Sequence, residues 1–181
     1  MKKIKIVLLS MILTLSSLFA TEYEVDKEIS LVTFKIRHAV VAKVEGKFNI
    51  FSATYEYDDT LNYFKSFEAE VDMASVDTDE KYRDKHLKEK VFDVLKYPKM
   101  TLKLMAQDGT SFKANLTIKG ITKEVEFTIF LSPKQEKTFI LSSKISRKDF
   151  NLKFSDMAEM GGVAVGDTIE INVLFSGVKR G

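Results

Sequence analysis

Apolar and polar residues alternate along most of the chain after residue 30. Neighbouring residues of a β-strand point to opposite faces of its sheet, so a period of two predicts strands with one buried face. Within residues 112–119, for example, every second residue is apolar. Runs of this kind predict eight strands, which lie around residues 32–36, 44–50, 67–73, 100–104, 112–118, 125–131, 139–145 and 169–175.

Short turn sequences separate these runs, and Lys119-Gly120 is typical of a hairpin. Short connections favour antiparallel neighbours. Residues 76–97 are highly charged and lack alternation, which predicts one or two short helices with Asp77, Thr78 or Asp79 as the N-cap. Such a chain suits a β-sandwich or a closed barrel, and periodicity alone does not choose between them or between a filled and a hollow interior.

The first twenty residues have the layout of a secretory signal peptide. Three lysines (Lys2, Lys3 and Lys5) precede an uncharged apolar run over residues 6–19, and Ala20 follows it. The run is shorter than the ~20 residues that span a bilayer as a helix. We therefore expect residues 1–20 to be a cleaved signal peptide and residues 21–181 to form one domain.

Charge and cysteine content narrow the classes of function. Removal of the three N-terminal lysines lowers the formal net charge from +2 to −1, which gives no reason to expect nucleic acid as a partner. The chain has no cysteine, which excludes disulfides, thiolate metal sites and a thiol nucleophile. The one long apolar run of the sequence lies in the signal segment, so we expect no stable insertion of the remaining chain into a membrane.

Several short motifs follow one another in order along the chain. They are Val25-Asp26, Arg37-His38, Gly46-Lys47-Phe48, residues 75–78 with residues 83–87, Phe92-Asp93, Tyr97-Pro98, residues 116–122, Arg147–Phe150 and Val165-Gly166-Asp167. In this order they resemble the motifs of the YceI-like family of periplasmic polyisoprenoid-binding proteins. The resemblance extends over about residues 22–176. Asn151 departs from it, since Gly usually stands there.

The resemblance implies an all-β fold, an eight-stranded antiparallel, extended lipocalin-like barrel with one or two short helices and a long central tunnel. It also implies a polyisoprenoid, an isoprenoid quinone or a fatty amide as the ligand. Proteins of this family are commonly homodimers. Together with the signal peptide, the resemblance predicts a periplasmic protein that carries or stores an apolar lipid.

An apolar lipid requires an apolar lining with a few polar groups that orient its head. The alternating faces supply such a lining, and the residues after the seventh strand add phenylalanine and methionine side chains that adapt to a flexible ligand. The candidate tunnel-lining residues are Phe34, Ile36, Phe48, Ile50, Phe67, Val71, Met73, Leu102, Leu104, Leu116, Ile118, Phe127, Ile129, Phe154, Met157 and Met160.

Five polar residues are candidates for the head-group or rim region: His38, Arg83, Asp84, His86 and Arg147. Arg83 is suited to a charge-assisted bond with a pyrophosphate, and it is equally suited to holding a helix against the rim. Arg147 follows the apolar face of its strand and requires an acidic partner, for which Asp149 and Asp84 are candidates. A partner in the wall would satisfy His38 equally well.

No catalytic or metal-binding motif accompanies these residues, so we expect neither an enzyme nor a metal site. The bound lipid is the expected ligand, and no cofactor is expected. Two alternatives stay open. One is a structural or stress-related scaffold with a filled barrel, and the other is a haem or electron-transfer protein that uses the two histidines.

Overall fold

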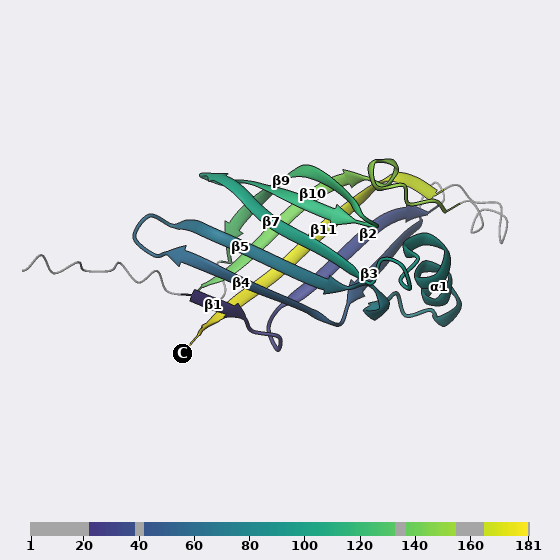
Figure 1. Cartoon of the computed structure of the whole chain (residues 1–181), viewed down its shortest axis with the longest axis horizontal. Coiled ribbons are helices and arrows are strands. Elements are labelled where there is room, and N and C mark those ends of the chain that lie inside the picture. The colour runs from purple at the N-terminus through teal and green to yellow at the C-terminus, as the bar shows by residue number, and fades with distance from the viewer. Residues whose placement is uncertain (1–21, 39–41, 133–136, 155–164, 181) are drawn as a thin grey trace, which may run out of the picture.

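Antiparallel strands close into a barrel in the computed structural model, with a helical segment at one end (Figure 1). The structure describes residues 22–38, 42–132, 137–154 and 165–180. The strands are β1 (Glu22–Val25), β2 (Leu31–His38), β3 (Ala42–Phe48), β4 (Phe51–Asp58), β5 (Tyr63–Asp72), β6 (Val76–Asp77), β7 (Lys99–Asp108), β8 (Ser111–Ile118), β9 (Ile121–Leu131), β10 (Thr138–Ser146) and β11 (Val165–Lys179). The helical elements are η1 (Met73–Ser75), α1 (Lys81–His86), η2 (Leu87–Phe92) and η3 (Arg147–Phe150).

Eight strands form the closed ring, in the order β1-β4-β5-β7-β8-β9-β10-β11, and β11 pairs back with β1. β2 and β3 continue this pattern toward the helical end, because β2 pairs with β11 and with β3. β1 and β2 are therefore two parts of one interrupted strand, and so are β3 and β4. The prediction of an eight-stranded antiparallel barrel is confirmed, although β1, β4 and the short β6 were not among the predicted strands.

The hairpin turns follow from residues that tolerate a positive φ. Lys119 and Gly120 have φ of 53° and 73°, which matches the tight two-residue turns that suit twisted strands. At Gly120 a Cβ atom would lie 2.9 Å from the Tyr97 ring, so space as well as conformation favours glycine.

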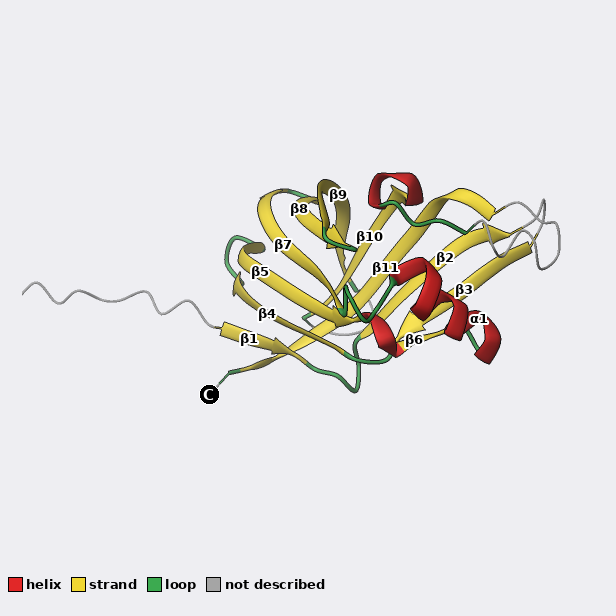
Figure 2. Ribbon diagram, turned by 45° about the vertical axis from the view of Figure 1, so that its right-hand side comes forward, coloured by secondary structure: helices red, strands yellow, loops and turns green. Residues whose placement is uncertain are grey.

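The helical segment, which we define as α1 and η2 together, lies at one end of the barrel (Figure 2). Glu80 caps its first turn by accepting hydrogen bonds from the amides of Tyr82 at 2.9 Å and Arg83 at 2.6 Å. The prediction of a helix here is confirmed, but the predicted N-cap residues were wrong. Asp77 ends β6 and Thr78 follows it, and the side chains of both bond to other groups.

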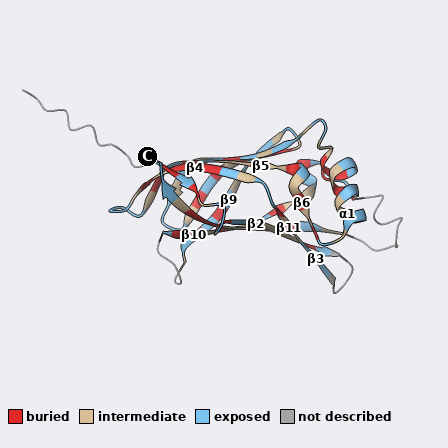
Figure 3. Ribbon diagram, turned by 90° about the horizontal axis from the view of Figure 1, so that it is seen from below, coloured by how far each residue is buried: buried red, intermediate tan, exposed pale blue. Residues whose placement is uncertain are grey.

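Aromatic side chains fill the opposite end of the barrel. Phe64 has no exposed surface. The centroid of its ring lies 4.7 Å from that of Tyr57 and 4.8 Å from that of Phe139. Edge-on and tilted ring pairs dominate, as expected for rings that pack with their quadrupoles offset. We call this group the aromatic cluster, and its members are Tyr23, Tyr55, Tyr57, Phe64, Phe67, Phe112, Phe139 and Phe175. Buried residues occur at intervals along the strands, whereas α1 has exposed residues and none that is buried (Figure 3).

Replacement of Gly177 by alanine tests the packing of the aromatic cluster. A Cβ atom at this position would overlap the hydroxyl of Tyr55 and lie 2.7 Å from its Cζ. We expect Gly177→Ala to lower the free energy of unfolding by about 1–3 kcal/mol, the usual cost of overpacking, in urea titrations. Removal of the hydroxyl by Tyr55→Phe should restore part of this loss in the double variant. Additive effects of the two substitutions would show that the contact is not the cause.

The cap at Glu80 predicts a dependence of stability on pH. Its hydrogen bonds from the amides of Tyr82 and Arg83 hold the pKa of this carboxyl below its ordinary value. A lowered folded-state pKa contributes stability above the unfolded pKa of about 4.3, and this contribution is lost as the pH falls through the folded-state pKa. Wild type should therefore exceed Glu80→Gln in stability at pH 6 and should match it in strong acid. An equal difference at every pH would contradict this.

Candidate binding cavity

An apolar cavity of about 70 Å³ lies between the helical segment and the neighbouring end of the barrel. We call it the outer cavity. Strands β2, β3, β8, β10 and β11 supply most of its wall, and the helical segment supplies Arg83, Leu87 and Phe92. Its other lining residues are Val32, Thr33, Phe34, Ile36, Val44, Phe48, Met73, Met100, Ile118, Ile145, Leu152, Phe154, Val165, Ile169 and Ile171.

A second apolar cavity of about 60 Å³, the inner cavity, lies next to the first along the barrel. The two share Val32, Met100 and Ile171 as lining residues, so they adjoin one another. The inner cavity is also lined by Phe67 and Phe175, which belong to the aromatic cluster. The interior therefore runs from the helical segment through two adjoining cavities to an end that is filled with rings.

Most predicted tunnel-lining residues lie at this interior. Phe34, Ile36, Phe48, Met73, Ile118 and Phe154 line the outer cavity, and Phe67, Val71, Leu102, Leu116 and Phe127 line the inner cavity. Ile129 is buried and Leu104 packs against the core, but neither lines a cavity. Met157 and Met160 lie outside the described residues.

The prediction for Ile50 was wrong. Its side chain is 60% exposed in the connection between β3 and β4. The alternation that includes Phe48 stops at Asn49, whose amide donates to the Ser75 carbonyl at 3.2 Å instead of continuing the strand. The Ile50 amide likewise bonds to Ser75 Oγ at 3.0 Å. These bonds turn Ile50 to the outside.

Arg83 is the one charged residue among the described lining residues of the two cavities. Its guanidinium donates from Nε to Thr78 Oγ1 at 2.8 Å and from Nη2 to the Thr78 carbonyl at 2.7 Å. Asp84 accepts from both the amide and the hydroxyl of Thr78. Arg83 and Asp84 thus fix the helical segment to the chain before it, and Arg83 also reaches the apolar interior.

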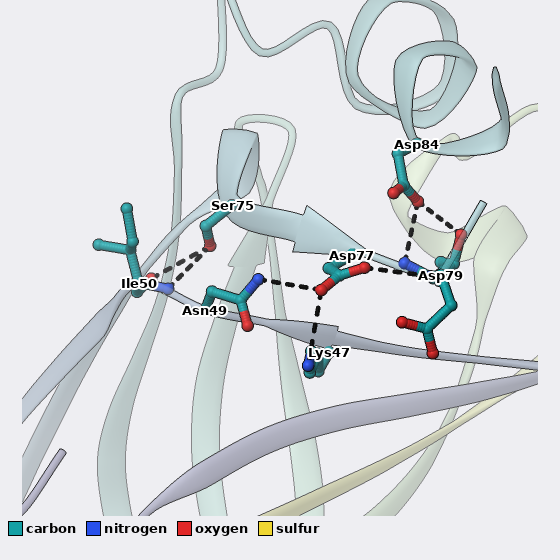
Figure 4. A network of polar contacts seen from close by, with 8 residues as sticks. Lys47, Asn49, Ile50, Ser75, Asp77, Asp79 and Asp84 are labelled. Carbon is teal, nitrogen blue, oxygen red and sulfur yellow. Dashed lines mark hydrogen bonds and ion pairs between the residues drawn. The ribbon is translucent and has the colours of Figure 1, made fainter. Parts of the chain in front are cut away.

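A polar network holds that preceding chain against β3 (Figure 4). The Asp77 carboxylate accepts from the Asp79 amide at 3.0 Å and from Asn49 Nδ2 at 3.2 Å, and it pairs with Lys47 at 3.5 Å. The hydrogen bond from the Asp79 amide, followed by that from Asn49, holds the pKa of Asp77 below its ordinary value. The helical segment is also fixed from the other side, where Lys119 Nζ donates to the Val91 carbonyl at 2.9 Å.

Arg147 is an anchor rather than a free rim group. Its partner is Asp167, 3.0 Å away, and not Asp149 or Asp84 as predicted. It also donates to the carbonyls of Gly166 at 3.2 Å and Leu152 at 3.1 Å. Since Leu152 lines the outer cavity, Arg147 positions part of the wall without lining either cavity itself.

The two histidines belong to separate elements, His38 to β2 and His86 to α1. The backbone of His38 pairs with Val165 and with Ala42, and its side chain lies outside the described residues. His86 is half-buried at the end of α1 and lines neither cavity. Within the described ranges, no three His, Asp or Glu side chains gather as metal ligands would.

Sequence reasoning missed the aromatic end and part of the inner wall. Phe51 and Ala53 of β4 line the inner cavity, whereas Tyr55 and Tyr57 enter the aromatic cluster. Their alternation with Ser52, Thr54 and Glu56 is present in the sequence and would have revealed the strand. No helix in the described part of the chain is both long and apolar enough to cross a membrane.

Comparison with known proteins agrees with this geometry. The family described as YceI-like domain matches residues 23–176. A UPF0312 protein of Yersinia pestis is 31% identical over 157 residues, which cover 79% of this chain and 82% of that protein.

Two solved structures share the fold. BcnA of Burkholderia cenocepacia has 26% identity and a TM-score of 0.68, over 83% of this chain and 98% of that one. A polyisoprenoid binding domain from Saccharophagus degradans has 12% identity and a TM-score of 0.68, over 87% and 98%. At 12% identity the likeness concerns the fold alone. The family match covers nearly all of the described barrel, and the chain belongs to the family of YceI-like domains.

Proposed function

We propose that this chain binds an apolar lipid with a long tail in the barrel interior and carries or stores it in the periplasm without catalysis. The observation that carries the proposal is the pair of adjoining apolar cavities between the helical segment and the aromatic cluster. The membership in the YceI-like family and the fold shared with a polyisoprenoid binding domain support it. The signal-peptide layout of residues 1–20 supports the location.

The driving force would be transfer of the tail out of water, which is favourable by about 0.8 kcal/mol for each buried CH₂ group. The two cavities of about 70 and 60 Å³ are small for a long isoprenoid, so binding requires the lining to move. Met73 and Met100 are suited to this, because an unbranched thioether side chain adapts to irregular neighbours. The fixed aromatic cluster sets the depth that the tail can reach.

The small cavities also favour the second candidate, a scaffold with a filled barrel. Native mass spectrometry of the protein, purified from the cells that produce it, separates the two. A bound mass that yields an isoprenoid or fatty compound on solvent extraction supports the lipid-binding proposal. A ligand-free mass, with no uptake of an added long-chain isoprenoid alcohol, favours the scaffold.

A larger side chain in the inner cavity should shorten the accepted tail. Ala69 lines this cavity, and Ala69→Phe would fill it while leaving the outer cavity open. We expect uptake of a long isoprenoid alcohol to fall at least about tenfold, since each excluded methylene of the tail costs about 1 kcal/mol or more. Uptake of a short isoprenoid should change little, as measured by titration with mass-spectrometric detection.

The matched control is Ala106→Phe, which adds the same side chain at an exposed position of β7. Thermal unfolding followed by circular dichroism must show that both variants fold. Undiminished uptake of the long alcohol by folded Ala69→Phe would contradict the assignment of the inner cavity to the tail.

Arg83 should favour an anionic head group over a neutral one. A hydrogen bond to a charged group contributes about 1.5–3 kcal/mol, so Arg83→Met should reduce the preference for an isoprenyl phosphate over the alcohol with the same tail about tenfold or more. The measurement is the ratio of the affinities for the phosphate and for the alcohol. Loss of the bonds between Arg83 and Thr78 would weaken the binding of both ligands equally and leave this ratio unchanged. An unchanged ratio would assign Arg83 to structure alone.

A further inference from the structure

We propose that the solvent side of residues 81–96 is a docking surface for an anionic phospholipid bilayer. This docking surface consists of the exposed side chains of Lys81, Tyr82, Lys85, Lys90, Leu95 and Lys96. The inference deepens the proposed function and rests on it in one respect, namely that a lipid must move between a membrane and the cavity.

Two large apolar side chains project into solvent at this end. Leu95 is 98% exposed and Tyr82 is 80% exposed, and no other described large apolar residue reaches these values. Leu95 lies in the turn after η2, and Tyr82 lies in the first turn of α1. Aromatic side chains with a polar tip are common at membrane–water interfaces, where one part is apolar and the other hydrated.

The charge of the same stretch is complementary to an anionic membrane. Residues 81–96 contain six lysine and arginine residues and three acidic ones. Asp84 is bonded to Thr78, and Glu89 lies 4.0 Å from Lys85. Basic residues beside exposed apolar ones are the pattern of segments that bind the surface of anionic bilayers.

The opposite end of the barrel differs in charge. β1, β4 and the turn after β4 carry Glu22, Glu24, Glu56, Asp58 and Asp59, and all of these except Glu56 form ion pairs with Lys65, Lys137 or Arg180. Because the basic residues at the aromatic end are largely neutralised by acidic partners, an anionic surface would attract the helical end more strongly. This orientation separates a directed membrane contact from general adhesion of a basic protein.

The helical segment links this surface to the cavity. Arg83, Leu87 and Phe92 line the outer cavity, whereas Tyr82 and Lys85 face solvent. One short segment thus has the lipid cavity on one side and the docking surface on the other. Docking would place the cavity next to the bilayer from which a lipid is taken.

A tryptophan reporter tests the orientation, because the chain has no tryptophan of its own. Leu95→Trp places the reporter in the docking surface. Leu61→Trp, at a 71% exposed position in the β4–β5 turn, is the matched control. The full chain is mixed with vesicles of phosphatidylglycerol and phosphatidylethanolamine, or of phosphatidylcholine alone.

We expect the emission of the Leu95→Trp variant to move to shorter wavelength, and to be quenched by brominated lipid, on the phosphatidylglycerol vesicles only. The emission of the Leu61→Trp variant should not change. A Leu95→Trp reporter that does not respond, or equal responses of the two variants, would overturn the proposal. A vesicle-independent shift that grows with protein concentration would also overturn it, because the surface would then be a contact between two copies of the chain.

Charge substitutions test the electrostatic part in vesicle co-sedimentation. At low salt each lysine near an anionic surface raises the affinity for that surface about fivefold. The triple variant Lys81→Ser, Lys85→Ser and Lys90→Ser should therefore bind the vesicles on the order of 100-fold more weakly. The control triple Lys103→Ser, Lys113→Ser and Lys123→Ser removes the same charge from exposed positions on β7, β8 and β9. Equal losses in the two triples would overturn the proposal. All variants share the same N-terminus, so its own affinity for lipid cancels.

Uptake of a dispersed isoprenoid alcohol, measured without vesicles, separates this proposal from the proposed function. The docking triple should keep full uptake. A protein that docks but takes up no lipid would refute the cavity function and leave the docking surface standing. A protein that takes up lipid but does not dock would refute the docking surface alone.

Discussion

The whole structure depends on the closure of the barrel by β11. One edge of this 15-residue strand pairs with β10, and the other edge pairs first with β2 and then with β1. A closed barrel leaves few unpaired backbone groups and encloses one apolar interior, which an open sheet of these strands would expose. Gly177 lies where β11 reaches β1, and the space that it leaves is occupied by Tyr55.

The interior that results is divided along its length. Rings fill one end, and the other end is bordered by a helical segment that hydrogen bonds hold to Thr78, just after β6, and to Lys119 in the turn between β8 and β9. The aromatic end consists of rings in mutual contact, whereas the outer cavity is lined by four phenylalanines together with aliphatic and methionine side chains, of which the methionines adapt most readily to irregular neighbours. The same barrel therefore combines a packed aromatic end with an end that retains two apolar cavities.

The sequence predicted the parts of this fold that depend on local pattern. Long alternating runs such as that of β8 identified strands and their inner faces, because burial of one face of a sheet requires an apolar residue at every second position. The hairpin at Lys119-Gly120 was equally predictable, since few residues adopt a positive φ. The short motifs identified the family.

Features set by contacts between distant residues were not predictable. Ile50 continues the alternation of β3 in the sequence, but its backbone bonds to Ser75 and Asp72 take it out of that strand, and its side chain is exposed. The partner of Arg147 is Asp167 because β11 lies alongside β10, which no local pattern reveals. The helix begins after Glu80, although Asp77 has the more usual capping side chain, because Asp77 is already bonded to the amide of Asp79 and to Asn49.

In the proposed lipid-binding function, the aromatic cluster would determine the order of events during lipid exchange. With that end filled by rings, a tail that enters beside the helical segment must enter tip first, and its head group stays at the opening. Departure reverses the sequence, so the head leads and the tip is the last part to leave. Under this proposal, loading and unloading would use the same opening, so the protein would serve one donor or one acceptor at a time rather than acting as a conduit between two.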